Sequence, residues 1–242
     1  TRYIGDWSSD VCSSDLLLTA VSALFGIVIM YLWASRATGG GLFGPDADPL
    51  LWQNYFWFVT TPAAYFAVLP AVGVISEVVA GVSRKAIAGY RLAVGAMIAL
   101  LAASFVTWGV RLLGSGQDEG LSLTFAALNL LPVLPAALLA YLWLATLHRG
   151  AVACAAPTTY LVAFLLQAGI GAGTGLFFSN LAVGSYLANT VFFTAHSHYL
   201  MMGGVMTALL AGLHYWWPKM TGRLYRQGLG RLAAMLYLVG LN

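Results

Sequence analysis

Charged residues are scarce in this 242-residue chain: they make up 8% of it, against 60% hydrophobic residues. Proteins that fold in water carry about 25% charged residues, so the composition is that of a chain solvated by lipid. The 11 lysines and arginines lie almost entirely between apolar stretches, which excludes nucleic acid as a partner. The two cysteines, Cys12 and Cys154, support neither a disulfide framework nor a cysteine-type metal site.

Long apolar stretches recur along the chain, whose mean hydropathy is +0.83. About 20 helical residues, at about 1.5 Å each, cross about 30 Å of hydrocarbon. The pattern therefore predicts an all-α fold, a polytopic transmembrane bundle of six complete helices with a truncated seventh. The predicted helices cover residues 17–34, 52–81, 91–113, 121–147, 157–181 and 187–217, and the seventh begins at about residue 231.

The two ends of the chain differ from the rest. Residues 1–16 (TRYIGDWSSDVCSSDL) are polar, lack the organisation of a signal peptide and resemble a translated sequencing adapter, so we expect a non-native leader. The last apolar run, from Leu232 to Asn242, reaches about 17 Å as a helix, which is too short to span. We expect residues 17–242 to be part of a larger membrane domain.

Positive charges alternate with the predicted helices and give the topology. One set of connections carries eight lysines and arginines, whereas the opposite set carries only Arg36. The eight are Arg84, Lys85, Arg91, Arg149, Lys219, Arg223, Arg226 and Arg231. Because cytoplasmic loops are enriched in lysine and arginine, the connection at residues 82–91 is predicted to face the cytoplasm.

Two sequence features stand out inside predicted helices. The glycine-rich run GIGAGTG (169–175) lies in an apolar stretch without a lysine, so it predicts close helix packing rather than a nucleotide loop. The segment AHSHY places His196 and His198 within a predicted membrane helix. Residues i and i+2 of a helix point about 200° apart, so these two imidazoles cannot chelate one metal ion.

Each histidine can instead bind a separate partner. Two haems, one on each side of the helix, would each take one neutral imidazole as an axial ligand. The alternative is a pair of buried histidines that form hydrogen bonds to other helices.

The run TAHSHYLMMGGVMTALLAGLHYWWPKMTG (194–222) resembles the haem-bearing helix of haem-copper (cytochrome c) oxidase subunit I. Three segments upstream resemble that family's sixth to eighth helices in order: DPLLWQNYFWFVTTPAAYFAVLP (48–70), SRKAIAGY (83–90) and WLATL (143–147). The resemblance implies that His196 is the axial ligand of a high-spin haem and His198 one axial ligand of a low-spin haem. It also implies that the second ligand of the low-spin haem belongs to a helix outside this sequence.

The family's copper ligands are not found at the matching positions. The resemblance places Thr61 at the first copper histidine, and Val110 and Arg111 at the adjacent pair. Valine cannot ligate, threonine is a poor copper ligand and arginine is a permanent cation. We therefore expect haem, of a type that the sequence does not specify, and no copper.

Two other residues of this region are candidates. Tyr65, four residues after Thr61 and thus on the same helix face, stands where the family has a tyrosine involved in oxygen chemistry, although it could equally be a core residue. Arg111 could snorkel outward, pair with a haem propionate, or occupy the place of the copper ion.

Three functions follow from these features. The sequence favours a copper-less, haem-binding subunit of a respiratory complex, embedded in a bacterial or archaeal plasma membrane beside other subunits and supplied by cytochrome c or quinol. The alternatives are a catalytic subunit of a terminal oxidase or nitric-oxide-reductase type, and a haem-free permease or structural protein. The broken-helix repeats of many transporters are not seen.

Overall fold

The computed structural model describes residues 25–39 and 48–242. The predicted leader, residues 1–16, and the start of the first predicted helix lie outside these residues. The described chain is helical and contains no strand, which confirms the all-α fold class. Its helices are Phe25–Ala37, α2 (Pro49–Ser83), α3 (Tyr90–Ser104), the 3-10 helix η1 (Trp108–Leu112), α4 (Glu119–Leu128), α5 (Val133–Leu147), α6 (Ala156–Gly175), the 3-10 helix η2 (Leu176–Ser179), α7 (Leu181–Leu187), α8 (Val191–His198), the π-helix η3 (Tyr199–Met206), α9 (Thr207–Thr221) and α10 (Gln227–Leu241).

Several predicted helix boundaries were wrong. The helix predicted for 91–113 ends at Ser104, and after three intervening residues the chain resumes as η1 at Trp108. The one predicted for 121–147 agrees with the apolar helical stretch Glu119–Leu147, whose winding is interrupted between α4 and α5 near Pro132, which has no N–H to donate. The helix predicted from residue 187 begins at Val191, where the Thr190 hydroxyl caps it, and then runs without a gap through α8, η3 and α9.

Membrane-spanning character is clear in three helical stretches, which are long and apolar enough to cross a bilayer: Pro49–Ser83, Glu119–Leu147 and Ala156–Ser179. Shorter apolar helices cover Phe25–Ala37, Tyr90–Ser104 and Gln227–Leu241. Large apolar side chains such as Leu134 and Tyr186 are exposed, as expected where the solvent is lipid.

Helix α2 begins and ends at identifiable signals. The Asp48 carboxylate accepts a hydrogen bond from the Leu50 amide (2.8 Å), and Pro49 occupies the first turn. Pro62 and Pro70 lie inside the helix, which membrane helices tolerate because neighbouring groups satisfy the freed carbonyls. Arg84 ends the helix in a left-handed conformation, with φ of 55°.

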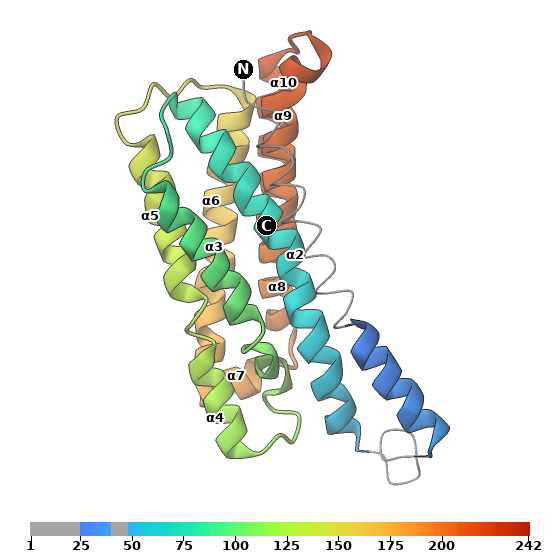
Figure 1. Ribbon diagram of the computed structural model, residues 1–242. Helices are drawn as coiled ribbons and strands as arrows, with labels where there is room; N and C mark the ends of the chain where they lie inside the picture. Colours follow the sequence, from blue (N-terminus) through green and yellow to red (C-terminus); the bar gives the residue numbers. More distant parts are fainter. Residues whose placement is uncertain (1–24, 40–47) are drawn as a thin grey trace.

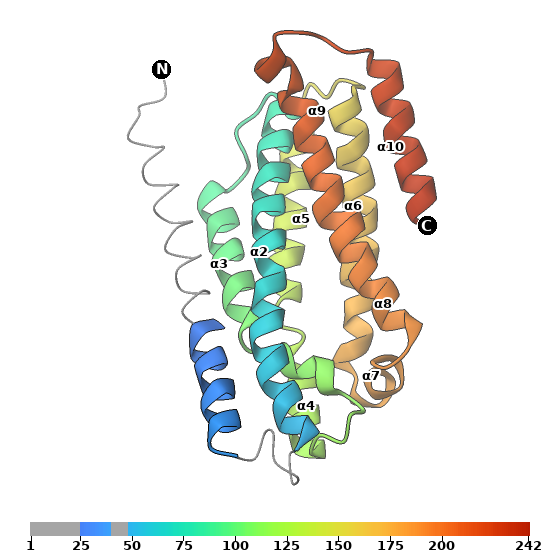
Figure 2. The ribbon, with the colours of Figure 1, turned by 90° about the vertical axis from the view of Figure 1, so that its right-hand side faces the viewer.

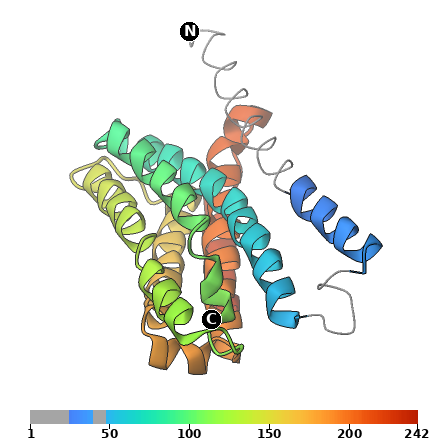
Figure 3. The ribbon, with the colours of Figure 1, turned by 60° about the horizontal axis from the view of Figure 1, so that its bottom comes forward.

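Two apolar cores hold the bundle together. The larger joins α2, α3, α5, α6, α9 and α10 around buried residues such as Ile75, Leu139 and Leu161. The smaller joins η1, α4 and η2 around Val110, Phe125 and Phe178. Figures 1 and 2 show the long helices side by side, with α4 and α7 gathered at one end. Viewed with that end forward, helix Phe25–Ala37 (blue) lies outside the group, beside α2 (Figure 3).

The three basic connections meet at the end opposite α4 and α7 (Figure 2). Lys85 donates a hydrogen bond to the His148 carbonyl, and Ala151 donates to that of Ser83 (3.2 Å). The Ala156 amide donates to the Gln227 side-chain carbonyl at the start of α10 (3.0 Å). The positive charges thus gather at one end of the bundle, as the alternation along the sequence predicts.

The turn between η1 and α4 gives a test of this packing. Gly114 and Gly116 both have positive φ, +75° and +87°, but an added Cβ at Gly114 would lie 2.7 Å from the Ser185 carbonyl oxygen, whereas Gly116 has open space. Gly116→Ala should therefore cost about 1–2 kcal/mol of unfolding free energy. Gly114→Ala should cost a further ~1–3 kcal/mol for the clash. Unfolding in sodium dodecyl sulfate measures both, and equal losses would contradict the contact between Gly114 and α7.

Candidate functional site

The helix that carries both candidate histidines changes its winding directly after them. α8 ends at His198, and the next eight residues, Tyr199–Met206, form a π-helix. The Met202 carbonyl there accepts hydrogen bonds from the Thr207 hydroxyl (3.0 Å) and from the Tyr237 hydroxyl of α10 (2.8 Å). π-Helical turns inside longer helices are rare, and those that occur are often found at functional sites. The segment Tyr199–Met206 is therefore a candidate part of a functional site.

His196 is half-buried against α6. Its Nδ1 lies 3.0 Å from the Gly171 carbonyl oxygen and 3.1 Å from the Thr174 hydroxyl. Because the Thr174 hydroxyl itself donates to the Gly171 carbonyl (2.9 Å), both neighbours of Nδ1 offer lone pairs to it. The partners therefore assign the proton to Nδ1 and the lone pair to Nε2, the ring nitrogen that a metal would have to bind.

The glycine run 169–175 makes this contact close. A Cβ at Gly175 would lie 3.1 Å from Cε1 of His196, and one at Gly171 would lie 2.9 Å from the Leu200 side chain. The structure agrees with the prediction that small residues here allow two helices to pack tightly. Thr174 and the Gly171 carbonyl were not singled out from the sequence, and the only available signal was a hydroxyl within a run of small residues.

The surroundings of His198 differ from those of His196. His198 is exposed, as expected for a residue two positions further round the helix. Between the two histidines, the Ser197 hydroxyl is buried without a hydrogen-bond partner among the described residues. The helix therefore presents one oriented imidazole and one exposed imidazole on different sides.

Arg111 is held by aromatic rings. Its guanidinium carbon lies 4.0 Å from the ring centre of Phe193 and 5.0 Å from that of Trp57. The residue is half-buried, so it does not snorkel freely outward, the first of the three alternatives that the sequence allowed. Such stacking is the usual packing of a guanidinium out of water. The two rings come from α2 and α8, far apart in the sequence, which is why sequence reasoning missed them.

Arg111 also links the remaining candidates. It lies within electrostatic range of the Tyr65 hydroxyl and of the His196 ring. Thr61 is on the same face of α2 as Trp57 and Tyr65, and its hydroxyl is buried without a described partner. Val110, next to Arg111, belongs to the smaller core and is 7% exposed. The structure thus brings Thr61, Tyr65, Arg111 and His196 into one region.

The donor set of this region does not suit a metal held by several side chains. Within residues 25–39 and 48–242, no three histidine, cysteine or acidic side chains come together in a metal-binding group. A haem iron is different, because the macrocycle supplies four of its ligands and the protein adds one or two. An imidazole that carries its lone pair on Nε2 supplies one such ligand.

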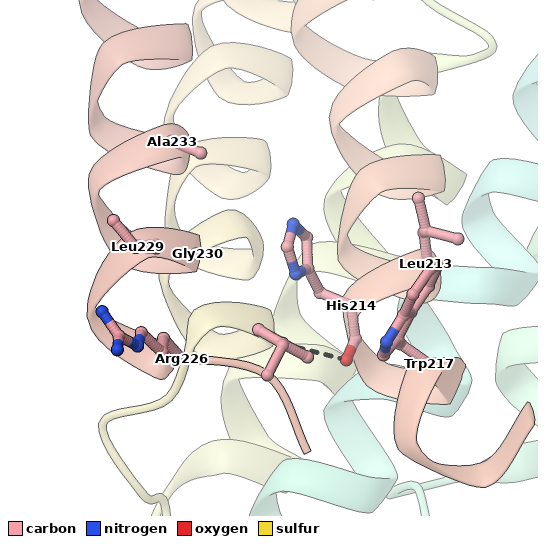
Figure 4. Close-up of a pocket in the computed structure, with 8 residues that line it drawn as sticks. Leu213, His214, Trp217, Arg226, Leu229, Gly230 and Ala233 are labelled. Carbon is pink, nitrogen blue, oxygen red and sulfur yellow. Dashed lines mark hydrogen bonds between the residues drawn. The ribbon is translucent and has the colours of Figure 1, made fainter. Parts of the chain in front are cut away.

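A separate cleft of about 420 Å³ lies between α9 and α10 (Figure 4). The His214 ring points into it and stacks on Tyr160, with ring centres 4.9 Å apart. Leu213, Trp217, Leu229 and Ala233 make its walls mainly apolar, with Arg226 at the rim. His214 follows His196 by eighteen residues, about 27 Å along a helix axis, so the cleft is distinct from the histidine pair.

Comparisons with known proteins agree with the sequence resemblance. The profile of the family described as "Cytochrome C and Quinol oxidase polypeptide I" matches residues 11–242. The chain is 32% identical over 238 residues to cytochrome c oxidase subunit 1 of Bacillus sp. (strain PS3), covering 98% of this chain and 38% of that protein. It is 34% identical over 242 residues to cytochrome c oxidase subunit 1 of Cereibacter sphaeroides (98% and 42%).

Quinol oxidase subunit 1 of Bacillus subtilis (strain 168) is 29% identical over 233 residues, which are 93% of this chain and 36% of that protein. The chain therefore spans about two fifths of the length of these relatives.

The aromatic support of Arg111 can be measured by a double-mutant cycle. Arg111→Met and Phe193→Leu should show a coupling energy of about 1–2 kcal/mol in unfolding free energy, because the pair is partly desolvated. The control pair is the exposed Lys219 and the partly buried Tyr215: Nζ lies 4.3 Å from the ring centre and 3.3 Å from the Tyr215 hydroxyl, to which it donates a hydrogen bond. Lys219→Met and Tyr215→Leu should couple by about 0.5–1 kcal/mol. An Arg111–Phe193 coupling below that of the control would contradict this arrangement.

Proposed function

Since the chain belongs to the family of cytochrome c and quinol oxidase polypeptide I, we propose that it is a haem-binding membrane subunit of a respiratory electron-transfer complex and that it has no copper site. The observation that carries the proposal is the hydrogen bonding of His196. A histidine that ligates a metal through one ring nitrogen usually donates the other N–H to a carbonyl, which fixes its tautomer and orientation. The Nδ1 contacts to Gly171 and Thr174 supply this support.

The two histidines would hold two haems. His196 would bind the high-spin haem through Nε2, and His198, exposed on a different side, would provide one axial ligand of the low-spin haem. When bound, haem supplies an iron that accepts and releases one electron. The protein's part is to orient each ring: the Gly171 carbonyl holds the proton on Nδ1, and close packing against Gly175 fixes the plane of the His196 ring.

Copper does not fit the residues present at the matching positions. Val110 has no donor atom and lies in an apolar core, and Thr61 offers a single neutral hydroxyl. The Arg111 guanidinium would repel a cation from the same space. Copper therefore has no part in the proposed function, and Tyr65 is proposed as a neighbour of the haem rather than as a partner of a metal centre.

The two alternative functions require other roles for the residues of this region. A terminal oxidase or nitric-oxide-reductase-type catalytic subunit would need a second redox metal beside the high-spin haem, for which this region offers no ligand set. A haem-free permease or structural protein would use His196 and His198 only for hydrogen bonds. The Nε2 lone pair of His196 and the exposed ring of His198 favour haem binding.

The surroundings of the subunit follow from the family. We propose that it lies in a bacterial or archaeal plasma membrane, contacts other subunits of a respiratory complex, and receives electrons from cytochrome c or from quinol. The relatives include both cytochrome c oxidase and quinol oxidase subunits, so the family alone does not select the donor.

Replacing each histidine separately should remove a different haem. In protein purified from its membrane, His196→Ala should abolish the carbon-monoxide-sensitive signal, and His198→Ala should abolish the low-spin signal, each losing about half of the haem. Reduced-minus-oxidised optical spectra and pyridine haemochrome content measure both effects.

His148→Ala, an exposed histidine at the end of α5, is the control and should leave both signals intact. Retention of both haem signals in the double variant of His196 and His198 would exclude these residues as ligands.

A further inference from the structure

We infer that Arg111 forms, with Thr61 and Tyr65, a binding site for a small carboxylate or oxyanion group. The site adjoins His196 but is built from residues that need no haem to exist, so it goes beyond the proposed function. In place of a metal cation, the protein would offer a fixed guanidinium charge, and the group that binds there would be an anion rather than a metal.

Aromatic rings cover the faces of the Arg111 guanidinium, and no described acidic side chain neutralises its charge. Phe193 and Trp57 pack against it, and rings satisfy the faces of a guanidinium but not its five in-plane N–H donors. The four acidic residues that the structure describes, Asp48, Glu77, Asp118 and Glu119, are all exposed, and none pairs with Arg111. A cation removed from water without a counter-charge is costly, so the site favours an incoming anion.

The Thr61 hydroxyl is a second polar group without a hydrogen-bond partner among the described residues. A threonine in a helix commonly donates its hydroxyl to the carbonyl four residues earlier, and the neighbouring Thr60 does so to Phe56 (2.7 Å). The Thr61 hydroxyl is buried and forms no such bond with any described residue. It lies on the α2 face between Trp57, which Arg111 stacks on, and Tyr65, which Arg111 reaches electrostatically.

The chemistry of these donors defines the ligand. The planar edge of a guanidinium matches two oxygens of a carboxylate, nitrite or similar ion, and hydroxyl groups can donate to the remaining lone pairs. The same chemistry has two sources: a free small anion, or a propionate group of haem held by His196. Both would place negative charge on the N–H edge of Arg111.

The test is the thermal unfolding of purified protein in increasing sodium formate, with ionic strength kept constant by a bulky sulfonate salt. Two samples are compared: the protein as purified, and the protein exchanged with haem dimethyl ester, which carries no free propionate. A saturable rise of the midpoint in both samples that Arg111→Met weakens indicates a free-anion site, whereas a rise that persists in Arg111→Met indicates formate bound to the haem iron. A rise confined to the ester sample indicates that a propionate fills the site.

Variants identify the donors. Arg111→Met should weaken the formate response roughly tenfold to a hundredfold, because charge-assisted hydrogen bonds are lost. Arg91→Met, at an exposed arginine of α3, should respond like the wild type. Thr61→Val should weaken the response, whereas Thr60→Val should not.

No response in either sample, or an undiminished response in Arg111→Met, would overturn the inference. A sample without haem would overturn the proposed function instead, and its own formate response would still decide the anion site.

Discussion

The hydrocarbon core of a membrane offers no water to polar groups, and the organisation of this protein depends on that constraint. Its helices satisfy their own backbone, and the groups that cannot do so find specific partners. The Tyr237 hydroxyl donates to the Met202 carbonyl in the π-helix, and Nδ1 of His196 is held by the Gly171 carbonyl of α6. Buried side-chain atoms of Thr61, Ser197, Gln117 and Gln167 have no partner among the described residues, and the Thr61 and Ser197 hydroxyls lie on the helices that form the candidate site.

Charge determines what this site can hold. A copper ion needs neutral or anionic donors around it, whereas here a guanidinium stacked on Phe193 stands among the candidates. An imidazole with its proton fixed on Nδ1 needs only one metal coordination position, which a haem iron provides. We therefore propose that this chain keeps the support for haem and offers a site for negative charge at the position of the second metal.

Much of the fold was predictable from the sequence, because the distribution of apolar residues and positive charges is governed by the bilayer. The all-α class, the path of α2 and the common end of the basic connections followed from that pattern. The break after Ser104 and the π-helix did not, because both are local changes of winding inside apolar runs. The histidine pair was visible in the sequence, whereas its support by Thr174 and the stacking of Arg111 depend on helices distant in the chain.

The most direct test of the central claim is a metal and haem analysis of the purified protein, combined with a reduced-minus-oxidised spectrum with and without carbon monoxide. We expect two haem signals, one of them sensitive to carbon monoxide, with less than stoichiometric copper. Stoichiometric copper together with both haems would contradict it and identify a conventional oxidase site. A colourless protein would contradict the proposed haem binding and leave only the membrane fold of the family.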